Sequence, residues 1–156
     1  MGIKFEGEFT AEAPRDEVYA FLSDPQKFAP CLPTYENLEM KDEKTAEVTV
    51  RIGVGKIKGN ATIQLVLAED DPPVRAAYDG KGKVMGGAFN MATSFELEDA
   101  EGGGTVVKWF GDLSMFGKLV ALAGGLIRPI AKKDIQRLVD ALQAALARGE
   151  ATGTAG

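Results

Sequence analysis

Apolar and polar residues alternate along most of the chain between residues 3 and 115, and this pattern predicts β-strands. A period of two places successive side chains on opposite faces of a strand, so each segment gains one apolar and one polar face. Clusters of turn-forming residues such as KDEK, EDDPP and AEGGG separate the segments. The pattern therefore predicts antiparallel strands over residues 3–10, 37–40, 46–54, 56–67, 74–84, 88–99 and 105–115.

Two short helices are predicted between the first and second strands. Residues 13–25 carry Pro14 where a first helical position favours proline, acidic residues in the first turn, and an apolar face after them. Residues 25–33 allow a second, shorter helix that prolines end. The order of elements is one strand, two helices, about six strands and one long helix, which is an α+β arrangement with a helix covering a curved sheet.

The last element is predicted to be a helix over residues 116–148, about 50 Å long if unbroken. A step of 100° per residue places large side chains on one stripe of its second half. The same stripe carries small side chains in the first half, apart from one arginine. From the C-terminal end, its members are Leu146, Leu142, Val139, Leu138, Ile135, Ala131, Arg128, Gly124, Ala121 and Gly117.

The small half of this stripe permits two interpretations. Small side chains let a helix approach a sheet closely, or they leave a hollow that an apolar molecule fills. Pro129 and the pair Gly124 and Gly125 predict a kink or hinge, which would let the helix move as a lid. Arg128 on a buried stripe requires a carboxylate, solvent at a pocket mouth, or a polar group of a ligand. We favour the second interpretation, in which an apolar molecule fills a hollow between the helix and the sheet.

Composition limits the chemistry. A chain of 156 residues with 45% hydrophobic residues suits one domain, expected over residues 1–148, with a disordered tail over 149–156. The net charge of −5 argues against nucleic-acid binding. The chain has no histidine, which removes the usual general base and metal ligand, and its one cysteine, Cys31, cannot form an intramolecular disulfide. We expect no catalytic residues, no metal and no covalent cofactor.

The same features predict a cytoplasmic protein. The opening residues lack the apolar stretch of a secretory signal. The apolar run LVALAGGLI has nine residues, whereas a membrane span needs about 20. Lys118, Lys132, Lys133 and Arg137 form a basic cluster on the last helix, which suits an acidic partner or peripheral contact with the inner face of the cell membrane.

Two further features concern the sheet. The segment GKGKVMGG is flanked by strands and lacks the spacing of a phosphate-binding loop, so its glycines are expected to bend the sheet around its contents. Phe110 does not fit the alternation of the last strand, in which Val107, Trp109, Leu113 and Met115 are expected to point inward.

Several segments together resemble the CoxG family of carbon monoxide dehydrogenase subunits. They are EGEFTAEAPRDEVYAFLSDPQKFAPCLP, GVGKIKG, DPP before a strand, GKGK followed by GG, and a closing helix of the G.L...GG.LI type. The resemblance extends from Ile3 to about Leu146. One departure is CLPT where the family pattern is CLPG, at a loop near the expected cavity mouth.

The resemblance implies a START-like (SRPBCC, Bet v 1-like) helix-grip fold, in which a curved antiparallel sheet of seven strands surrounds a long C-terminal helix with a hydrophobic cavity between them. Members of this family are associated with a molybdenum-containing carbon monoxide dehydrogenase or related hydroxylases. They are linked to maturation, to membrane attachment of the enzyme and to handling of isoprenoid quinone. Some members carry a C-terminal extension beyond the point where this sequence ends at ARGEATGTAG.

The leading hypothesis is therefore a non-enzymatic binding protein for a lipid or a quinone-like molecule. One alternative is a docking module with a solid core that recruits a hydroxylase to the membrane, and a third is a START-like enzyme. Tyr78, Trp109 or Arg128 are expected to orient a polar head group. The predicted cavity wall is Val50, Ile52, Ile63, Leu65, Tyr78, Met85, Phe89, Met91, Trp109, Leu113, Val120, Ile127 and Arg128, and the predicted mouth is Phe28, Cys31, Leu32 and Tyr35.

Overall fold

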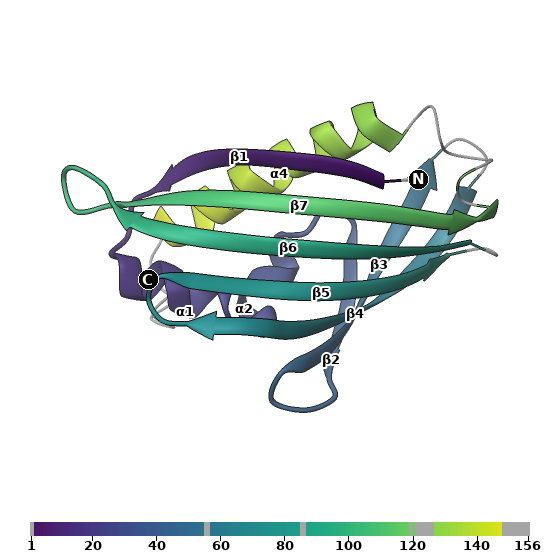
Figure 1. Cartoon of the computed structure of the whole chain (residues 1–156), viewed down its shortest axis with the longest axis horizontal. Coiled ribbons are helices and arrows are strands. Elements are labelled where there is room, and N and C mark those ends of the chain that lie inside the picture. The colour runs from purple at the N-terminus through teal and green to yellow at the C-terminus, as the bar shows by residue number, and fades with distance from the viewer. Residues whose placement is uncertain (1, 55–56, 85–86, 119, 121–126, 148–156) are drawn as a thin grey trace.

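The computed structural model describes residues 2–54, 57–84, 87–118, 120 and 127–147. Its elements follow the predicted order (Figure 1). The helices are α1 (Arg15–Leu22), α2 (Pro25–Phe28), the 3-10 turn η1 (Ala29–Cys31) and α4 (Ile127–Ala147). The strands are β1 (Gly2–Ala11), β2 (Tyr35–Met40), β3 (Thr45–Val54), β4 (Ile57–Asp71), β5 (Arg75–Val84), β6 (Gly87–Asp99) and β7 (Thr105–Gly117).

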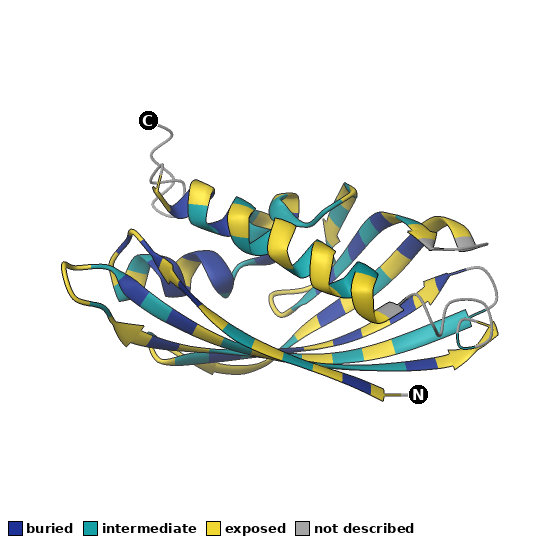
Figure 2. Cartoon of the chain, turned by 90° about the horizontal axis from the view of Figure 1, so that it is seen from above, coloured by how far each residue is buried: buried dark blue, intermediate teal, exposed yellow. Residues whose placement is uncertain are grey.

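The strands form one antiparallel sheet of seven, in the order β1-β7-β6-β5-β4-β3-β2. Every strand from β2 to β7 pairs with its neighbour in sequence, whereas β1 pairs with β7. The helices α1 and α2 connect β1 to β2, which are the two edge strands of the sheet. The sheet curves, and α4 crosses its concave face (Figure 2).

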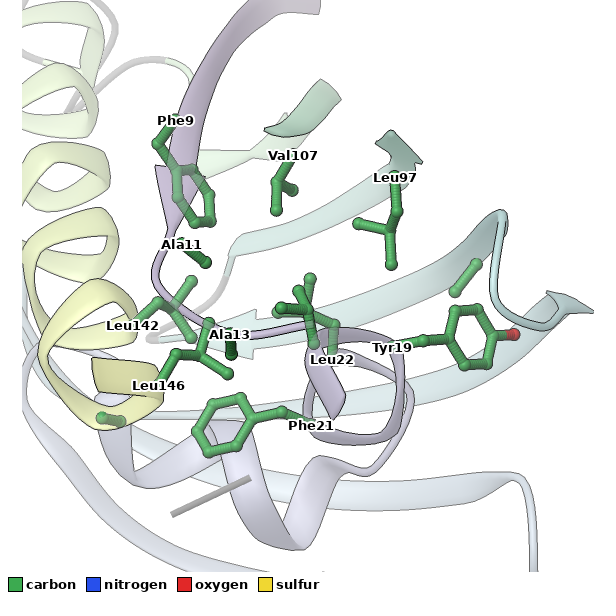
Figure 3. Close-up of a cluster of buried hydrophobic side chains, with 13 residues drawn as sticks. Phe9, Ala11, Ala13, Tyr19, Phe21, Leu22, Leu97, Val107, Leu142 and Leu146 are labelled. Carbon is green, nitrogen blue, oxygen red and sulfur yellow. The ribbon is translucent and has the colours of Figure 1, made fainter. Parts of the chain in front are cut away.

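One end of the molecule is solidly packed, and we call it the closed end. There the last turns of α4 and the helix α1 meet the ends of β1, β6 and β7 (Figure 3). The largest fully buried side chains here include Phe21, Leu22 and Leu146. Burying a large apolar side chain contributes about 1.5–3 kcal/mol, so this cluster supplies much of the fold's stability. Its members are Phe9, Ala11, Ala13, Val18, Tyr19, Phe21, Leu22, Ala76, Leu97, Val107, Leu142, Ala145 and Leu146.

The other half of the concave face is less completely buried, and we call it the open end. A second cluster joins Ile3, Ala29, Val48, Val50, Ala61, Leu65, Tyr78, Val84 and Met115. The apolar side chains packed around it keep part of their surface exposed, although they point toward α4. They include Phe5, Ile52, Ile63, Phe89, Met91 and Leu113 from the sheet, and Val120 and Ile130 from above it.

Two predictions for the C-terminal region need correction, and a third stays untested. Phe116 and Gly117 belong to β7 and not to a helix, because the strand continues pairing with β6 as far as Gly117. α4 starts at Ile127, so Pro129 lies in its first turn, where the missing amide hydrogen costs no helical hydrogen bond. Gly124 and Gly125 lie outside the described residues. No helix in the described ranges has the length and hydropathy needed to cross a bilayer.

Candidate ligand-binding site

The open end carries most of the side chains that the sequence assigned to a cavity wall. Val50, Leu65 and Tyr78 are buried there, in the second cluster. Seven more remain partly exposed: Ile52, Ile63, Phe89, Met91, Trp109, Leu113 and Val120. Trp109 differs from the others because it packs against the closed-end cluster. Met85 and the side chain of Ile127 lie outside the described residues.

Large side chains lie flat on this face because glycines face them from neighbouring strands. A Cβ atom on Gly82 would lie 2.1 Å from the ring of Phe89, and one on Gly80 would lie 2.6 Å from Met91. Gly7 is opposite Trp109 in the same way, with a Cβ distance of 2.7 Å. These glycines therefore have a packing role, which is more specific than the sheet bending expected from sequence.

Gly111 shows that the middle of the inner face is not filled. It pairs with Phe5 on β1 and Thr93 on β6, and both partners belong to the inward-facing set. A Cβ atom built on Gly111 meets nothing within 4 Å, apart from atoms of its chain neighbours. Since a packed interior normally surrounds each atom with van der Waals contacts, there is open space beside Gly111.

Three hydroxyl groups enter the interior from β5, β6 and β7, and two are bonded to backbone carbonyls. Tyr78 donates to the carbonyl oxygen of Leu22 at 2.8 Å, and Thr105 donates to that of Ala13 at 2.7 Å. Burial raises the pKa of Tyr78 far above its ordinary value, so its hydroxyl keeps its proton. Thr93 makes no side-chain hydrogen bond within the described residues.

The four residues predicted at the mouth all lie on or beside η1 and are half-buried: Phe28, Cys31, Leu32 and Tyr35. Phe28 contacts the ring of Tyr78 edge to face, with 5.4 Å between centroids. Cys31 packs against the closed-end cluster, and Leu32 and Tyr35 pack against the open-end cluster. The predicted mouth therefore lies where the two clusters adjoin.

The mouth loop also explains how the chain tolerates threonine in CLPT. Thr34 has a φ of 61°, in the left-handed region that favours glycine. Its hydroxyl donates to the carbonyl oxygen of Arg51 at 2.6 Å, and Arg51 donates its backbone amide to Thr34 at 3.0 Å. Thr34 thus bonds to Arg51 of β3 through both its hydroxyl and its backbone carbonyl, and these two hydrogen bonds offset the backbone strain.

The profile of the family described as the CoxG subunit of carbon monoxide dehydrogenase matches residues 7–147. The chain belongs to the CoxG family. The fold and the sequence resemblance are thereby confirmed, and the family together with the START-like fold supports a ligand-binding or accessory role. No curated protein matches the chain.

Solved structures share the fold of this CoxG family member over nearly its whole length. A conserved protein from Geobacillus kaustophilus is 20% identical, with a TM-score of 0.83 over 94% of this chain and 96% of that one. A START superfamily protein from Mycobacterium smegmatis is 10% identical, with a TM-score of 0.71 over 93% and 97%. The Zhui aromatase/cyclase from Streptomyces sp. R1128 is 20% identical, with a TM-score of 0.65 over 97% and 94%. Such low identities establish a common fold only.

Arg128 does not lie on a buried stripe of α4 as predicted. It is exposed in the first turn of the helix, because the large residues that hold α4 down, such as Leu142 and Leu146, lie at its other end. Lys132, Lys133 and Arg137 are exposed as well. None of these four cations takes part in an ion pair within the described residues, so they form a basic face on this CoxG protein.

The predicted cavity wall left out several residues of the inner face, among them Phe5, Thr93, Phe95 and Gly111. Thr93 and Phe95 share the alternation of β6 with Phe89 and Met91, which were assigned to the wall, so strict counting along this strand includes them. Phe110, which did not fit the pattern, is 38% exposed and simply faces outward from β7.

Two depressions outside the concave face are lined mostly by polar and charged residues. The larger, about 640 Å³, lies over the outer face of β1, β6 and β7 and is lined by residues including Glu96, Lys108 and Phe110. Its arginine, Arg75, already pairs with Glu69 at 2.6 Å and Glu96 at 2.9 Å. The other, about 590 Å³, lies between α2 and the β2–β3 turn. Within the described ranges no three metal-binding side chains converge.

Proposed function

We propose that this CoxG family member is a non-enzymatic carrier that holds one long apolar molecule between the open end of the sheet and α4. The observation that supports this most strongly is the incomplete burial of large apolar side chains that face the helix, together with the empty space at Gly111. A water-soluble protein normally buries such surface in its own core. A ligand in this space would cover it.

Burial of apolar surface would supply most of the affinity. Each square ångström removed from water contributes about 25 cal/mol, so the half-buried side chains of β3, β4, β6 and β7 provide a driving force without any charged contact. At the open end, the inner face of the sheet carries no carboxylate or ammonium group among the described inward positions. This favours a neutral cargo, and we propose a lipid or an isoprenoid-quinone-like molecule.

A carrier role fits the chemistry of the interior better than catalysis. Two of its hydroxyls are bonded to backbone carbonyls, and Tyr78 retains its proton to high pH. General acid–base catalysis needs a group whose pKa lies near the working pH, within reach of a reacting atom. Some structures of the same fold are enzymes, such as the aromatase/cyclase above, so the fold alone does not decide this point.

The family suggests the setting of this carrier. We propose that it serves a carbon monoxide dehydrogenase or a related molybdenum hydroxylase, as the family name implies. The chain itself has no redox centre in this proposal. Its task would be to bring an apolar molecule to, or take it from, the enzyme at the inner surface of the cell membrane.

The test is native mass spectrometry of the protein purified from its own host, followed by extraction and identification of the bound material. A carrier releases one apolar molecule in near-stoichiometric amount. Purified protein that contains no such molecule, and that takes up neither a long-chain lipid nor a quinone when these are added, would contradict the proposal.

A second candidate is a docking module that recruits the hydroxylase to the membrane without a ligand. The basic face of α4 favours it, because four exposed cations, none of them in an ion pair within the described ranges, suit an anionic surface. A pull-down of the hydroxylase with salt titration tests this role. Loss of binding after Lys132→Glu and Lys133→Glu, in protein that carries no ligand, would favour docking over transport.

A further inference from the structure

At the centre of β6 the inner face of the sheet carries a polar side chain, Thr93, to which the proposed carrier function assigns no role. Thr93 stands between Tyr78 on β5 and Gly111 on β7, directly paired with each. It shares its parity with Met91 and Phe95, which pack in the core, so its side chain faces the interior. It is half-buried and has open space on the side of Gly111.

The other interior hydroxyls are already engaged. Tyr78 is bonded to Leu22 and Thr105 to Ala13, whereas Thr93 makes no side-chain hydrogen bond within the described residues. A hydroxyl that is removed from water without a hydrogen-bond partner destabilises the complex. A ligand that fills the space beside Gly111 would shield Thr93 from water, so it must supply a partner or bear this cost.

We infer that Thr93 is the anchor for the head group of the cargo, and that the cargo is an apolar molecule with a hydrogen-bonding oxygen, carbonyl or hydroxyl, at one end. This inference rests on the proposed carrier function and specifies its ligand. It also replaces the expected roles of Tyr78 and Arg128, since the first donates its hydrogen to Leu22 and the second is exposed on α4.

The position of Thr93 sets the direction of the ligand. Phe95, the next inward residue along β6 toward the closed end, packs against both clusters and therefore marks their boundary. Beyond it, Leu97 is 3% exposed and leaves no room. On the other side, Met91, Phe89 and Leu113 are half-buried. The head group thus lies at the boundary, and the tail follows the strands toward the open end.

The test compares two ligands that differ in one oxygen, 2-tridecanone and tridecane, through displacement of the neutral fluorescent probe N-phenyl-1-naphthylamine. Thr93→Val removes the hydroxyl and keeps the β-branched shape that suits a strand. One neutral hydrogen bond corresponds to a loss of about fivefold to tenfold in affinity. We expect that loss for the ketone only, with tridecane unchanged.

Three further variants complete the design. Thr93→Ser keeps the hydroxyl and should retain the preference for the ketone. Thr93→Ala is a second variant without the hydroxyl, to be used if Thr93→Val does not fold. Thr62→Val, on the outer face of β4, should leave the affinity for both ligands unchanged.

The outcomes separate the two proposals. Unchanged ketone affinity in both hydroxyl-free variants, or a parallel loss of both ligands, would overturn the role of Thr93 and leave the carrier function standing. Failure of the parent protein to bind either ligand would overturn the carrier function and this inference with it.

Discussion

Gly111 is the residue whose replacement most directly tests whether the interior space is used. A Cβ atom there forces no neighbour aside, because it meets nothing within 4 Å, and a longer side chain extends from it into the open space. We expect Gly111→Leu to fold and to lose most of its affinity for an apolar ligand, since the new side chain occupies part of the ligand volume. The measurement is displacement of a fluorescent apolar probe, with stability checked by urea unfolding.

Gly53 offers a matched control for this substitution. It is also a strand glycine with nothing within 4 Å of a built Cβ, but it is exposed on the outer face of β3. Gly53→Leu should bind the probe as the parent does. Equal loss of binding in both variants, or unchanged binding in Gly111→Leu, would show that the space at Gly111 is not the site.

Tyr78 makes the free energy of unfolding depend on pH. Burial raises its pKa above the ordinary value of 10.0, so the unfolded chain ionises this group at a pH where the folded protein still holds the proton. The stabilisation is fully present below pH 10 and declines as the pH rises above it. Tyr19 acts in the same sense, because burial and its hydrogen bond to Asp70 raise its pKa.

We expect Tyr78→Phe to lose about 1 kcal/mol of unfolding free energy at neutral pH, because the bond to Leu22 is lost. Its stability should also decline less steeply above pH 10 than that of the parent. Urea unfolding from neutral to alkaline pH measures both effects. An alkaline slope identical to that of the parent would contradict the assignment of this decline to Tyr78.

The two ends of α4 differ in how deeply they are buried. α4 is held at its C-terminal end by Leu142, Ala145 and Leu146, each at most 3% exposed, while Ile130 near its start is only half-buried. Figure 2 shows the same gradient along the helix. One end of α4 is therefore part of the core, and the other end covers the open half of the sheet.

Two leucine truncations separate these roles. Leu142→Ala removes buried methyl groups at the closed end and should cost about 2–5 kcal/mol of unfolding free energy. Leu113→Ala, on the half-buried part of β7, should cost less stability but weaken ligand binding more. Chemical unfolding and probe titration on both variants test this. The reverse ranking in either assay would refute the division.

The elements also show what the sequence could and could not predict. The order of the strands and the inward parity of Val50, Ile63 and Phe89 followed from alternation, because antiparallel strands with one apolar face have a strict period of two. The start of α4 did not follow from the sequence. The predicted helix began at Phe116, whereas Phe116 and Gly117 are the last residues of β7 and α4 begins at Ile127. Arg128 was misplaced for a different reason: it shares the helical face of Ile135, but α4 is held against the core only at its other end, so its first turn is exposed.

Candidate-site residues were harder to predict than the fold. That Gly80 and Gly82 lie under Met91 and Phe89 depends on the pairing of β5 with β6, which one strand pattern does not reveal. The significance of Thr93 depends on its lack of a hydrogen-bond partner within the described residues, which matters only once Tyr78 and Thr105 are seen to have theirs. Parity along a strand gives the face of a residue but not its partners.

The whole molecule is electrically asymmetric along the axis of its hollow. Exposed acidic residues gather at the closed end, on the strand ends and turns there: Glu12, Asp16, Glu69, Asp70, Asp71, Asp99 and Glu101. Exposed basic residues gather at the open end: Lys4, Lys58, Lys81, Lys83, Lys118, Arg128, Lys132 and Lys133. A protein of net charge −5 thus presents a cationic open end.

We expect this asymmetry to favour binding to anionic vesicles with the open end toward the bilayer. Each Lys or Arg near such a surface contributes about 1 kcal/mol, so Lys132→Gln with Lys133→Gln should weaken binding about thirtyfold. The double variant Lys41→Gln, Lys44→Gln, in the β2–β3 turn, is the control and should bind as the parent does. Vesicle flotation in low and high salt gives the measurement.

Binding to neutral vesicles as strong as to anionic ones, or insensitivity to salt, would contradict the electrostatic mechanism.

The pairs formed by Gly7 with Trp109, Gly80 with Met91 and Gly82 with Phe89 have a consequence for how this family diverges. The glycine of a pair cannot be enlarged alone, since a methyl group on it comes too close to its neighbour. A relative that enlarges the glycine must shrink its neighbour, so we expect such positions to co-vary across homologues. Gly111 has no such constraint, so we expect larger residues at this position in relatives of the proposed carrier that hold a smaller molecule.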